Sequence, residues 1–448
     1  MLENDLECVR AAIARIPVSR PISTVAAVDG QTLIGHPTLS RVSVGDRATV
    51  HAGAHRVGGE VIRLSQAGVV ILLDVLAEGV GIGDRILFDV PPVWAPHQGW
   101  IGRVLDPDGQ PLDGAPILPG MTDTPIEAGP PPPNLRGRLG QRLQTGMAVF
   151  NTMLPIVRGQ RMGLFAGSGV GKSTLIADLA RGFDADVVVI ALVGERGREV
   201  RHFVDEVLGP AGMARAVVIA ATSDRAASVR RRCAPAAMAV AEYFRDLGLH
   251  VCLFVDSITR FCEAHREVAV AQGETAGLRG YPASTATAIA KLCERAGPGV
   301  TESGTITAVF SVLVAGSDMD EPVADMLRGV LDGHIVLDRA IAERGRFPAI
   351  DVVRSVSRAL PEAANAQENR IIQEARHMMS VHDRAALMIQ TGLYEAGADP
   401  AIDKAVACHE ALEQFVTIND GRDALGHFAK LRQALGSSPM QSDTSAVR

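Results

Sequence analysis

A glycine-rich stretch near the middle of the chain has the residue types and spacing of a phosphate-binding loop. Its residues are, in order, Ala166, Gly167, Ser168, Gly169, Val170, Gly171, Lys172, Ser173 and Thr174. The stretch follows an apolar run and precedes a predicted helix, where glycines let successive backbone N–H groups turn toward phosphates. Lys172 would reach the β- and γ-phosphates, and the Ser173 hydroxyl would bind Mg²⁺. We therefore expect Gly167 to Thr174 to bind ATP with Mg²⁺.

Two further segments predict that the bound nucleotide is hydrolysed. The apolar run 251–255 ends in Asp256, a carboxylate that can hold the magnesium shell, through water. Glu195 follows another apolar run, and ligands gather at the carboxyl ends of strands in parallel sheets. Glu195 is the expected catalytic carboxylate, because a carboxylate there can orient and polarise the attacking water. Arg196 and Arg260 are expected to neutralise phosphate charge; the alternative for the segment around Glu195 is a solvated charged turn.

The segments around these residues predict the elements that must position them. Apolar runs at 162–166, 187–193, 251–255 and 306–314 alternate with helical stretches, which indicates a mostly parallel sheet with helices on both faces. Short β-rich runs before this region indicate a small barrel or sandwich. After residue 360 the strands give way to helices. The expected division is a docking helix at 1–18, a β-barrel at 19–92, an α/β ATPase domain at 93–360, a helical domain at 361–436 and a disordered tail at 437–448.

The N-terminal segment has the pattern of a short amphipathic helix that ends before Pro17. Its apolar residues at helical spacing are Leu6, Val9, Ile13 and Ile16. This stripe either packs on the protein's own domains or docks a partner. A run of arginines at 230–232 is expected to form a solvated helical face.

The composition favours a large soluble enzyme over a nucleic-acid-binding protein. The chain has 448 residues, of which 47% are hydrophobic and 21% charged, and its net charge is −7. Proteins that grip nucleic acid usually have a basic surface. The six cysteines show no CxxC spacing, which fits a reducing cytosol rather than a disulfide or zinc framework. The acidic N-terminus and the short apolar runs predict a cytoplasmic protein with no signal peptide or transmembrane segment.

These motifs in combination resemble the catalytic core shared by rotary ATP synthases and type III secretion ATPases. The similarity spans about residues 20–420, and its shared segments are 166–174, 194–199, 256–260, 280–282, 331–334, 347–351 and 355–358. Segments 102–106, 159–167 and 392–394, with Gly397, Asp399, Pro400 and Asp403, resemble the flagellar and injectisome branch in particular. The strict phosphate-loop pattern has glycine at position 166, and an alanine such as Ala166 is usual in that branch.

The resemblance implies a RecA-like P-loop ATPase core with an N-terminal small β-barrel and a C-terminal helical domain. It implies a homohexameric ring with nucleotide at each subunit interface, in which Phe347 stacks on adenine and Arg358 is an arginine finger for a neighbour. The implied function is ATP hydrolysis that energises flagellar type III protein export, at the cytoplasmic face of the inner membrane. The implied partners are a dimeric stalk-like regulator bound by the N-terminal helix, a central stalk protein, the export gate and chaperone–substrate complexes, with no nucleic acid.

Several alternatives remain open at this stage. The nearest is the ATPase of a non-flagellar injectisome, which has almost the same motifs. The others are the catalytic subunit of a proton-driven synthase, a hexameric RNA translocase and a purely structural nucleotide-binding protein. The resemblance places the 273–281 loop at the central channel of the ring, where relatives often carry prolines in place of Thr275 and Ala276. Relatives also tend to have a tyrosine in place of Phe347, and phenylalanine keeps the stacking face without the hydroxyl.

Overall fold

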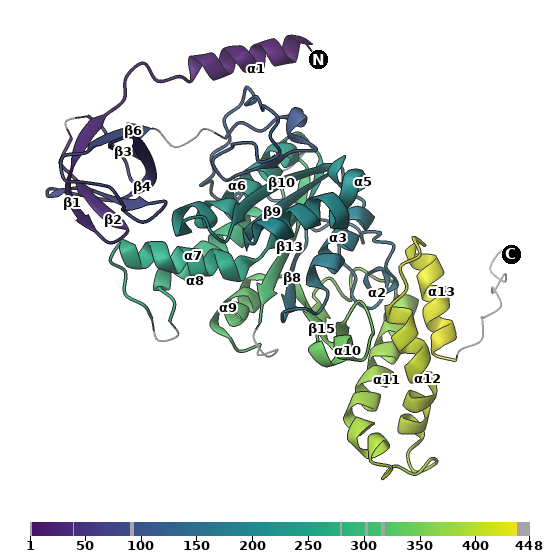
Figure 1. Ribbon diagram of the computed structural model, residues 1–448. Helices are drawn as coiled ribbons and strands as arrows, with labels where there is room; N and C mark the ends of the chain where they lie inside the picture. The colour runs from purple at the N-terminus through teal and green to yellow at the C-terminus, as the bar shows by residue number, and fades with distance from the viewer. Residues whose placement is uncertain are drawn as a thin grey trace.

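We describe the protein from a computed structural model, which places residues 2–38, 40–89, 94–277, 280–300, 303–314 and 319–436. The tail predicted at 437–448 lies outside these residues. A barrel, an α/β domain and a helical region follow one another along the chain, with the barrel and the helical region at opposite ends of the molecule (Figure 1). No helix in the described part of the chain is long and apolar enough to cross a membrane.

A closed barrel of six antiparallel strands precedes the α/β domain. Its strands pair in the order β1-β2-β5-β4-β3-β6 and are β1 (Ile22–Asp29), β2 (Thr32–Gly35), β3 (Arg47–Ala52), β4 (His55–Ser65), β5 (Gly68–Leu73) and β6 (Arg85–Asp89). Alternate side chains such as Leu33, Val50 and Ile86 point inward and are fully buried. Gly68 is required where β2 and β5 meet, because a Cβ there would lie 2.2 Å from the Gly35 carbonyl oxygen. The predicted barrel is confirmed.

The α/β domain contains a mostly parallel sheet, in the order β15-β14-β8-β13-β11-β9-β10-β7, with β12 paired to β13. The strands are β7 (Val104–Leu105), β8 (Arg161–Ala166), β9 (Val187–Glu195), β10 (Ala216–Thr222), β11 (His250–Asp256), β12 (Gly297–Pro298), β13 (Thr305–Leu313), β14 (Gly333–Leu337) and β15 (Ile350–Ser357). Side chains alternate between two cores: Val188 and Ile190 of β9 pack in one, and Val189 and Ala191 in the other. Strands buried on both faces explain the continuous apolar runs of the sequence.

Helices cover both faces of this sheet, as the alternation of runs predicts. They are α2 (Ala148–Asn151), α3 (Lys172–Gly182), α4 (Gly197–His202), α5 (Gly209–Met213), α6 (Ala227–Asp246), α7 (Ile258–Ala271), α8 (Ala283–Arg295), α9 (Pro322–Val330) and α10 (Arg339–Glu343), with the short helical turns η1 (Gln98–Trp100) and η2 (Phe203–Leu208). Helix α3 packs in the core on one face of the sheet, which also contains side chains of the C-terminal helices. Helix α6 packs in the core on the other face.

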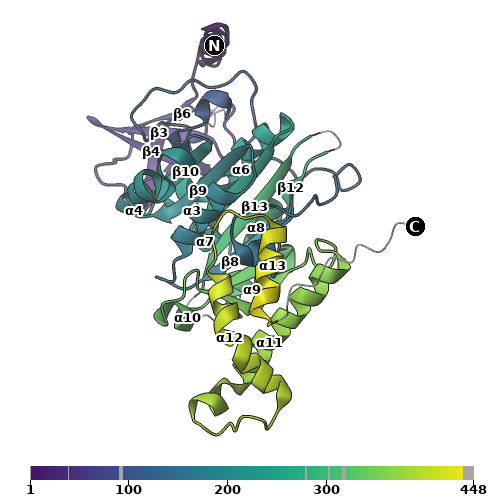
Figure 2. The same ribbon diagram turned by 90° about the vertical axis from the view of Figure 1, so that its right-hand side faces the viewer.

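The C-terminal region consists of α11 (Ala366–Gln390), α12 (Pro400–Val416) and α13 (Ala424–Ala434). The α11–α12 hairpin projects away from the sheet, as Figure 2 shows from the side. Side-chain caps begin each helix: Asn365 and Glu368 form a capping box on α11, and Asp399 and Asp423 cap α12 and α13. Leu412 and Phe415 anchor the base of α12 in the sheet core.

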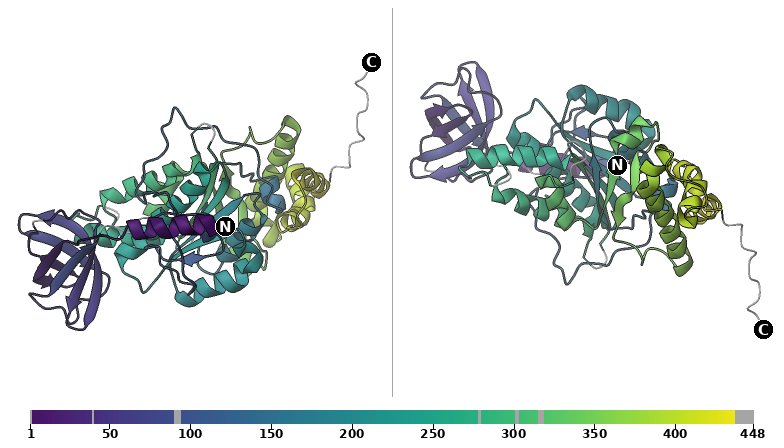
Figure 3. Two further views of the ribbon diagram at one scale, coloured as in Figure 1. Left: turned by 90° about the horizontal axis from the view of Figure 1, so that it is seen from above. Right: turned by 90° about the horizontal axis from the view of Figure 1, so that it is seen from below.

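The N-terminal helix α1 (Leu2–Ala14) lies over the α/β domain in the view from above (Figure 3). Its inner face contains the buried Cys8, and Arg15 just beyond it donates hydrogen bonds to the Gly120 carbonyl and the Asp123 carboxylate. Its apolar stripe faces outward instead: the exposed fractions of Leu6, Val9, Ile13 and Ile16 are 63%, 38%, 62% and 66%. The structure therefore does not show this stripe packed on the described domains, which was one of the two alternatives.

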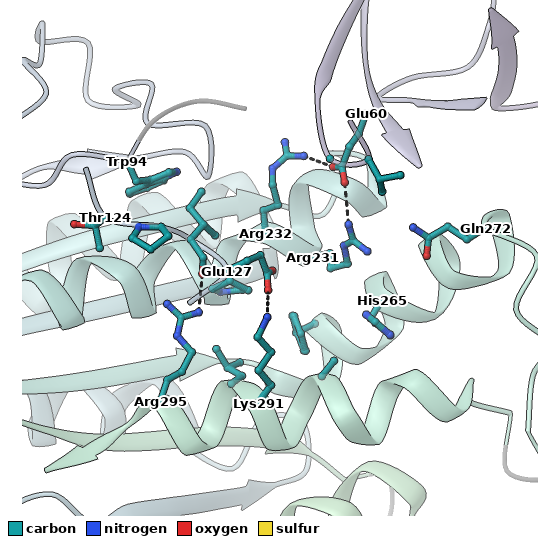
Figure 4. A pocket seen from close by; sticks show the side chains of 18 of the residues that line it. Glu60, Trp94, Thr124, Glu127, Arg231, Arg232, His265, Gln272, Lys291 and Arg295 are labelled. Carbon is teal, nitrogen blue, oxygen red and sulfur yellow. Dashed lines mark hydrogen bonds and ion pairs between the residues drawn. The ribbon is translucent and has the colours of Figure 1, made fainter. Parts of the chain in front are cut away.

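The arginine run at the start of α6 is not the solvated face that the sequence suggests. Glu60 of the barrel is almost fully buried and accepts hydrogen bonds from Arg231, at 2.9 Å, and from Arg232 (Figure 4). Arg232 also binds Asp108 at 2.7 Å, while Arg230 pairs with Glu267 at 3.1 Å. The expectation is wrong because the first turns of α6 face the barrel, which brings a buried carboxylate to them.

Replacing Glu60 should loosen the barrel from the α/β domain. In Glu60→Gln both arginines lose a buried anionic partner, and breaking such a pair from one side costs about 3 kcal/mol. We expect a lower midpoint in urea unfolding. Glu267→Gln is the control, because its carboxylate is half exposed and exposed ion pairs contribute about 0–1 kcal/mol. Equal midpoints for the two variants would show that Glu60 does not join the domains.

Candidate functional site

The glycine-rich loop turns between the end of β8 and the start of α3. Gly169 and Gly171 have φ values of +77° and +86°, a conformation that favours glycine. Gly171 is the N-cap residue of α3, so the loop opens directly onto the N-terminus of that helix. Ser168, Ser173 and Thr174 are exposed, whereas Val170 is buried and anchors the loop. Exposed backbone and hydroxyl groups at a helix N-terminus fit a phosphate chain with its cation.

Lys172 and Asp256 form an ion pair beside this loop. Both side chains are largely buried, with 11% and 4% exposed. Asp256 ends β11, and its carboxylate also accepts a hydrogen bond of 2.7 Å from the Ser311 hydroxyl on β13, the strand between β8 and β11. The sequence reasoning missed Ser311; the only available signal was a hydroxyl inside an otherwise apolar run. A lysine and a hydrogen-bonded carboxylate thus meet where a triphosphate and Mg²⁺ would be bound.

Glu195 lies at the end of β9, the strand next to β11. Its side chain is 15% exposed, and Arg260 approaches it with Nε at 3.5 Å from Oε1. Arg260 is held in place by a 2.7 Å hydrogen bond from Nη1 to the Gly194 carbonyl. Burial, and next the negative charge of Asp256, raise the pKa of Glu195 to about 7, against the opposing charges of Arg260 and Lys172. A carboxylate with this pKa can take up and release a proton near neutral pH.

Phe347 lies beside the glycine-rich loop although it is far from it in sequence. A Cβ on Gly171 would lie 3.3 Å from Cδ1 of Phe347. Phe347 is 52% exposed, so about half of the residue is not buried in the core. An exposed aromatic ring next to a phosphate-binding loop can stack on a nucleotide base.

Two of the predicted site residues do not join this cluster within the chain. Arg196 is exposed and pairs with Glu199 at 3.3 Å. Arg358 follows β15, which runs antiparallel to β14: Ile350 is opposite Leu337, the neighbour of Ala166, whereas Ser357 is opposite Gly333. A strand of this length spans about 25 Å at 3.3 Å per residue, so Arg358 lies at the far end of the sheet from its own P-loop.

Fold and site together define a P-loop ATPase with a RecA-like core. Residues 146–357 match the model of the ATP synthase alpha/beta family, nucleotide-binding domain, and residues 364–435 match the type III secretion system EscN ATPase C-terminal domain. With the relatives below, these matches show that the chain belongs to the flagellar and type III secretion ATPases of the ATP synthase alpha/beta family, and it is an ATP hydrolase.

Relatives match along nearly the whole chain. A protein of Caulobacter vibrioides named "Flagellum-specific ATP synthase" is 44% identical over 91% of this chain and 94% of its own length. The "Type 3 secretion system ATPase" of Xanthomonas euvesicatoria is 40% identical over 80% of this chain and 77% of its own. The assembled ATPase EscN of enteropathogenic E. coli superposes with a TM-score of 0.84 at 33% identity, over 92% of this chain and 100% of EscN.

The raised pKa of Glu195 makes the stability of the protein depend on pH. The folded protein holds this proton up to about pH 7, whereas the unfolded chain releases it near 4.5, so ionisation disfavours folding as pH rises between these values. The thermal midpoint of the wild type should therefore fall relative to that of Glu195→Gln from pH 4.5 to 7 and stay level above. Each pH unit contributes at most about 1.4 kcal/mol. Glu127→Gln, at an exposed site outside the surroundings of Glu195, should follow the wild type; parallel curves for all three would contradict the assignment.

Proposed function

We propose that this protein is the Mg-ATP-hydrolysing ATPase that energises flagellar type III protein export. The observation that carries the proposal is that Lys172, at the start of α3 in the P-loop, meets Asp256 and Glu195 at the carboxyl ends of the adjacent parallel strands β11 and β9. Flagellum-specific names among relatives from Caulobacter, Bacillus and Salmonella, at 43–45% identity, favour the flagellar system. The ATPase of an injectisome is the second candidate, because the Xanthomonas relative is 40% identical.

Each group in the cluster has a part in hydrolysis under this proposal. The backbone of Gly167 to Thr174 cradles the phosphates, and Lys172 leaves its ion pair with Asp256 to neutralise them. Ser173 and, through water, Asp256 hold Mg²⁺, which polarises the phosphate when it is bound. Glu195 orients the attacking water and accepts its proton, a task that suits a pKa near 7. Arg260 supports Glu195, and Phe347 stacks on adenine.

The position of Arg358 supports a site that is completed by a second subunit. Arg358 lies at the far end of the sheet from its own P-loop, and its guanidinium makes a 3.3 Å hydrogen bond to the Arg328 carbonyl. It is exposed, and so is Arg196, so both can reach another copy. We infer a homohexameric ring in which Arg358 serves a neighbour's nucleotide. The relative EscN has been solved as an assembled ATPase, both without and with its central stalk EscO, which supports an assembly of this kind.

The outward stripe of α1 supports docking of a partner at this end of the protein. Its exposed apolar side chains suit a dimeric stalk-like regulator. A pull-down with residues 1–16 deleted tests this contact, and unchanged capture of the regulator would reject it. The remaining proposed partners are a central stalk protein, the export gate and chaperone–substrate complexes, which would hold the ring at the cytoplasmic face of the inner membrane.

The flagellar assignment predicts that export of flagellin depends on the P-loop of this protein. In a strain that lacks the gene, wild type should restore flagellin to the medium, whereas Lys172→Ala, which cannot neutralise the phosphates, should not. The measurement is flagellin in the culture supernatant, with equal cellular amounts of both proteins as the control. If the strain that lacks the gene still releases flagellin into the medium, the flagellar assignment is wrong and the injectisome assignment takes its place.

The shared active site predicts that hydrolysis depends on subunit concentration. An arginine finger supplied by a neighbour is worth about 10³–10⁵ in rate, so Arg358→Ala should lose nearly all turnover while it still binds ATP. The specific activity of the wild type should rise with protein concentration. Arg339→Ala removes another exposed arginine and should change neither property. Flat specific activity across dilution would reject a site completed by a neighbour.

A further inference from the structure

The loop that bears Phe347 connects α10 to β15 and is tied to the C-terminal helices. Because half of the Phe347 side chain is exposed, the core does not fix its ring, whose position depends on the backbone of this loop. The residue immediately before it, Arg346, has a side chain that is only 9% exposed. What Arg346 contacts therefore decides how firmly Phe347 is held.

Arg346 joins two parts of the protein that are distant in sequence. Its Nη2 donates a hydrogen bond of 2.8 Å to the carbonyl of Ile350, the first residue of β15. Its Nε lies 2.9 Å from Oε2 of Glu413 on α12. Neither Nε nor Nη1 forms a hydrogen bond among the described residues, so the charge of Glu413 close to Nε is the main compensation for the burial of this guanidinium. Partial burial makes such an ion pair stronger than one on the surface, because water screens it less.

The C-terminal hairpin holds Glu413 in a fixed place. Leu412 and Phe415, which flank Glu413, are buried in the core of the α/β domain. The rings of His382 and His409 stack with centroids 3.4 Å apart and join α11 to α12. Arg376 of α11 donates a 2.9 Å hydrogen bond to the Ser355 carbonyl of β15. In Figure 1, α10 and β15 lie beside the base of this hairpin.

We propose that Arg346 is a positioning residue that holds Phe347 beside the P-loop through its ion pair with Glu413, so that nucleotide affinity follows the position of α12. The inference rests on the proposed stacking of Phe347 on adenine. Among the described residues, the side chain of Arg346 forms its hydrogen bond with Ile350 and its ion pair with Glu413, and none with the P-loop or the reacting groups, so it acts through its neighbour. A displacement of the hairpin would move Glu413, release the loop and reduce the time that Phe347 spends over the base.

A double-mutant cycle on ATP hydrolysis tests this route. Glu413→Gln keeps the size of the side chain and removes its charge; it should raise KM for ATP about fivefold and leave kcat within about twofold, as expected when binding alone is lost. Phe347→Ala should raise KM more. Glu413→Gln should add nothing to Phe347→Ala, because the ion pair acts through that ring. Glu410→Gln, one turn away on α12 and outside the Arg346 contact, should match the wild type.

The outcomes separate this inference from the proposed function. Independent effects of Glu413→Gln and Phe347→Ala, or an unchanged KM in Glu413→Gln alone, would overturn the positioning role of Arg346. If Phe347→Ala itself leaves KM unchanged, the stacking role of Phe347 fails instead, and this inference fails with it. Thermal melting checks that each variant folds. Should Glu413→Gln not fold, Arg346→Gln, which removes the positive charge that pairs with Glu413, replaces it in the cycle with the same expectation.

Discussion

The parallel alignment of β8, β11 and β9 is the constraint on which the site depends. Parallel strands end at the same edge of a sheet, and these three, with β13 among them, are consecutive in the sheet order. The alignment brings Lys172, Asp256 and Glu195 together from segments far apart in sequence. It also concentrates charge in a largely buried region, because apolar strands with two covered faces surround it. The ion pair of Lys172 with Asp256 and the raised pKa of Glu195 are consequences of that crowding.

Ion pairs join the α/β domain to the barrel on one side and to the C-terminal helical region on the other. Toward the barrel, the buried carboxylate of Glu60 accepts hydrogen bonds from Arg231 and Arg232. Toward the helical region, Arg346 pairs with Glu413. In both places an arginine spans two parts of the chain and satisfies more than one acceptor, which suits its planar fork of donors. Such junctions are more specific than apolar contacts, since a shift of one side leaves a buried charge without its partner.

Local sequence was sufficient to predict the P-loop, the strands that end in Asp256 and Glu195, and the class of each structural region. These features arise from short-range physics: glycine spacing, apolar runs of strand length and helix caps. The same reasoning failed for the arginines at 230–232, because whether a polar helix face meets water or a buried carboxylate depends on what packs against it. Ser311 was missed for a similar reason, since a hydroxyl within a strand shows its partner only when the neighbouring strand is placed.

The sequence by itself determined the chemistry available to this protein and the order of its domains, because both are encoded in residue type and local spacing. Only the tertiary structure decided which of these groups meet. It brings Phe347 beside Gly171 and places Arg358 at the opposite end of the sheet, since β15 runs antiparallel to β14. It also turns the apolar stripe of α1 outward and buries Cys8. Proximity across the fold is set by strand order and packing, and no local pattern contains that information.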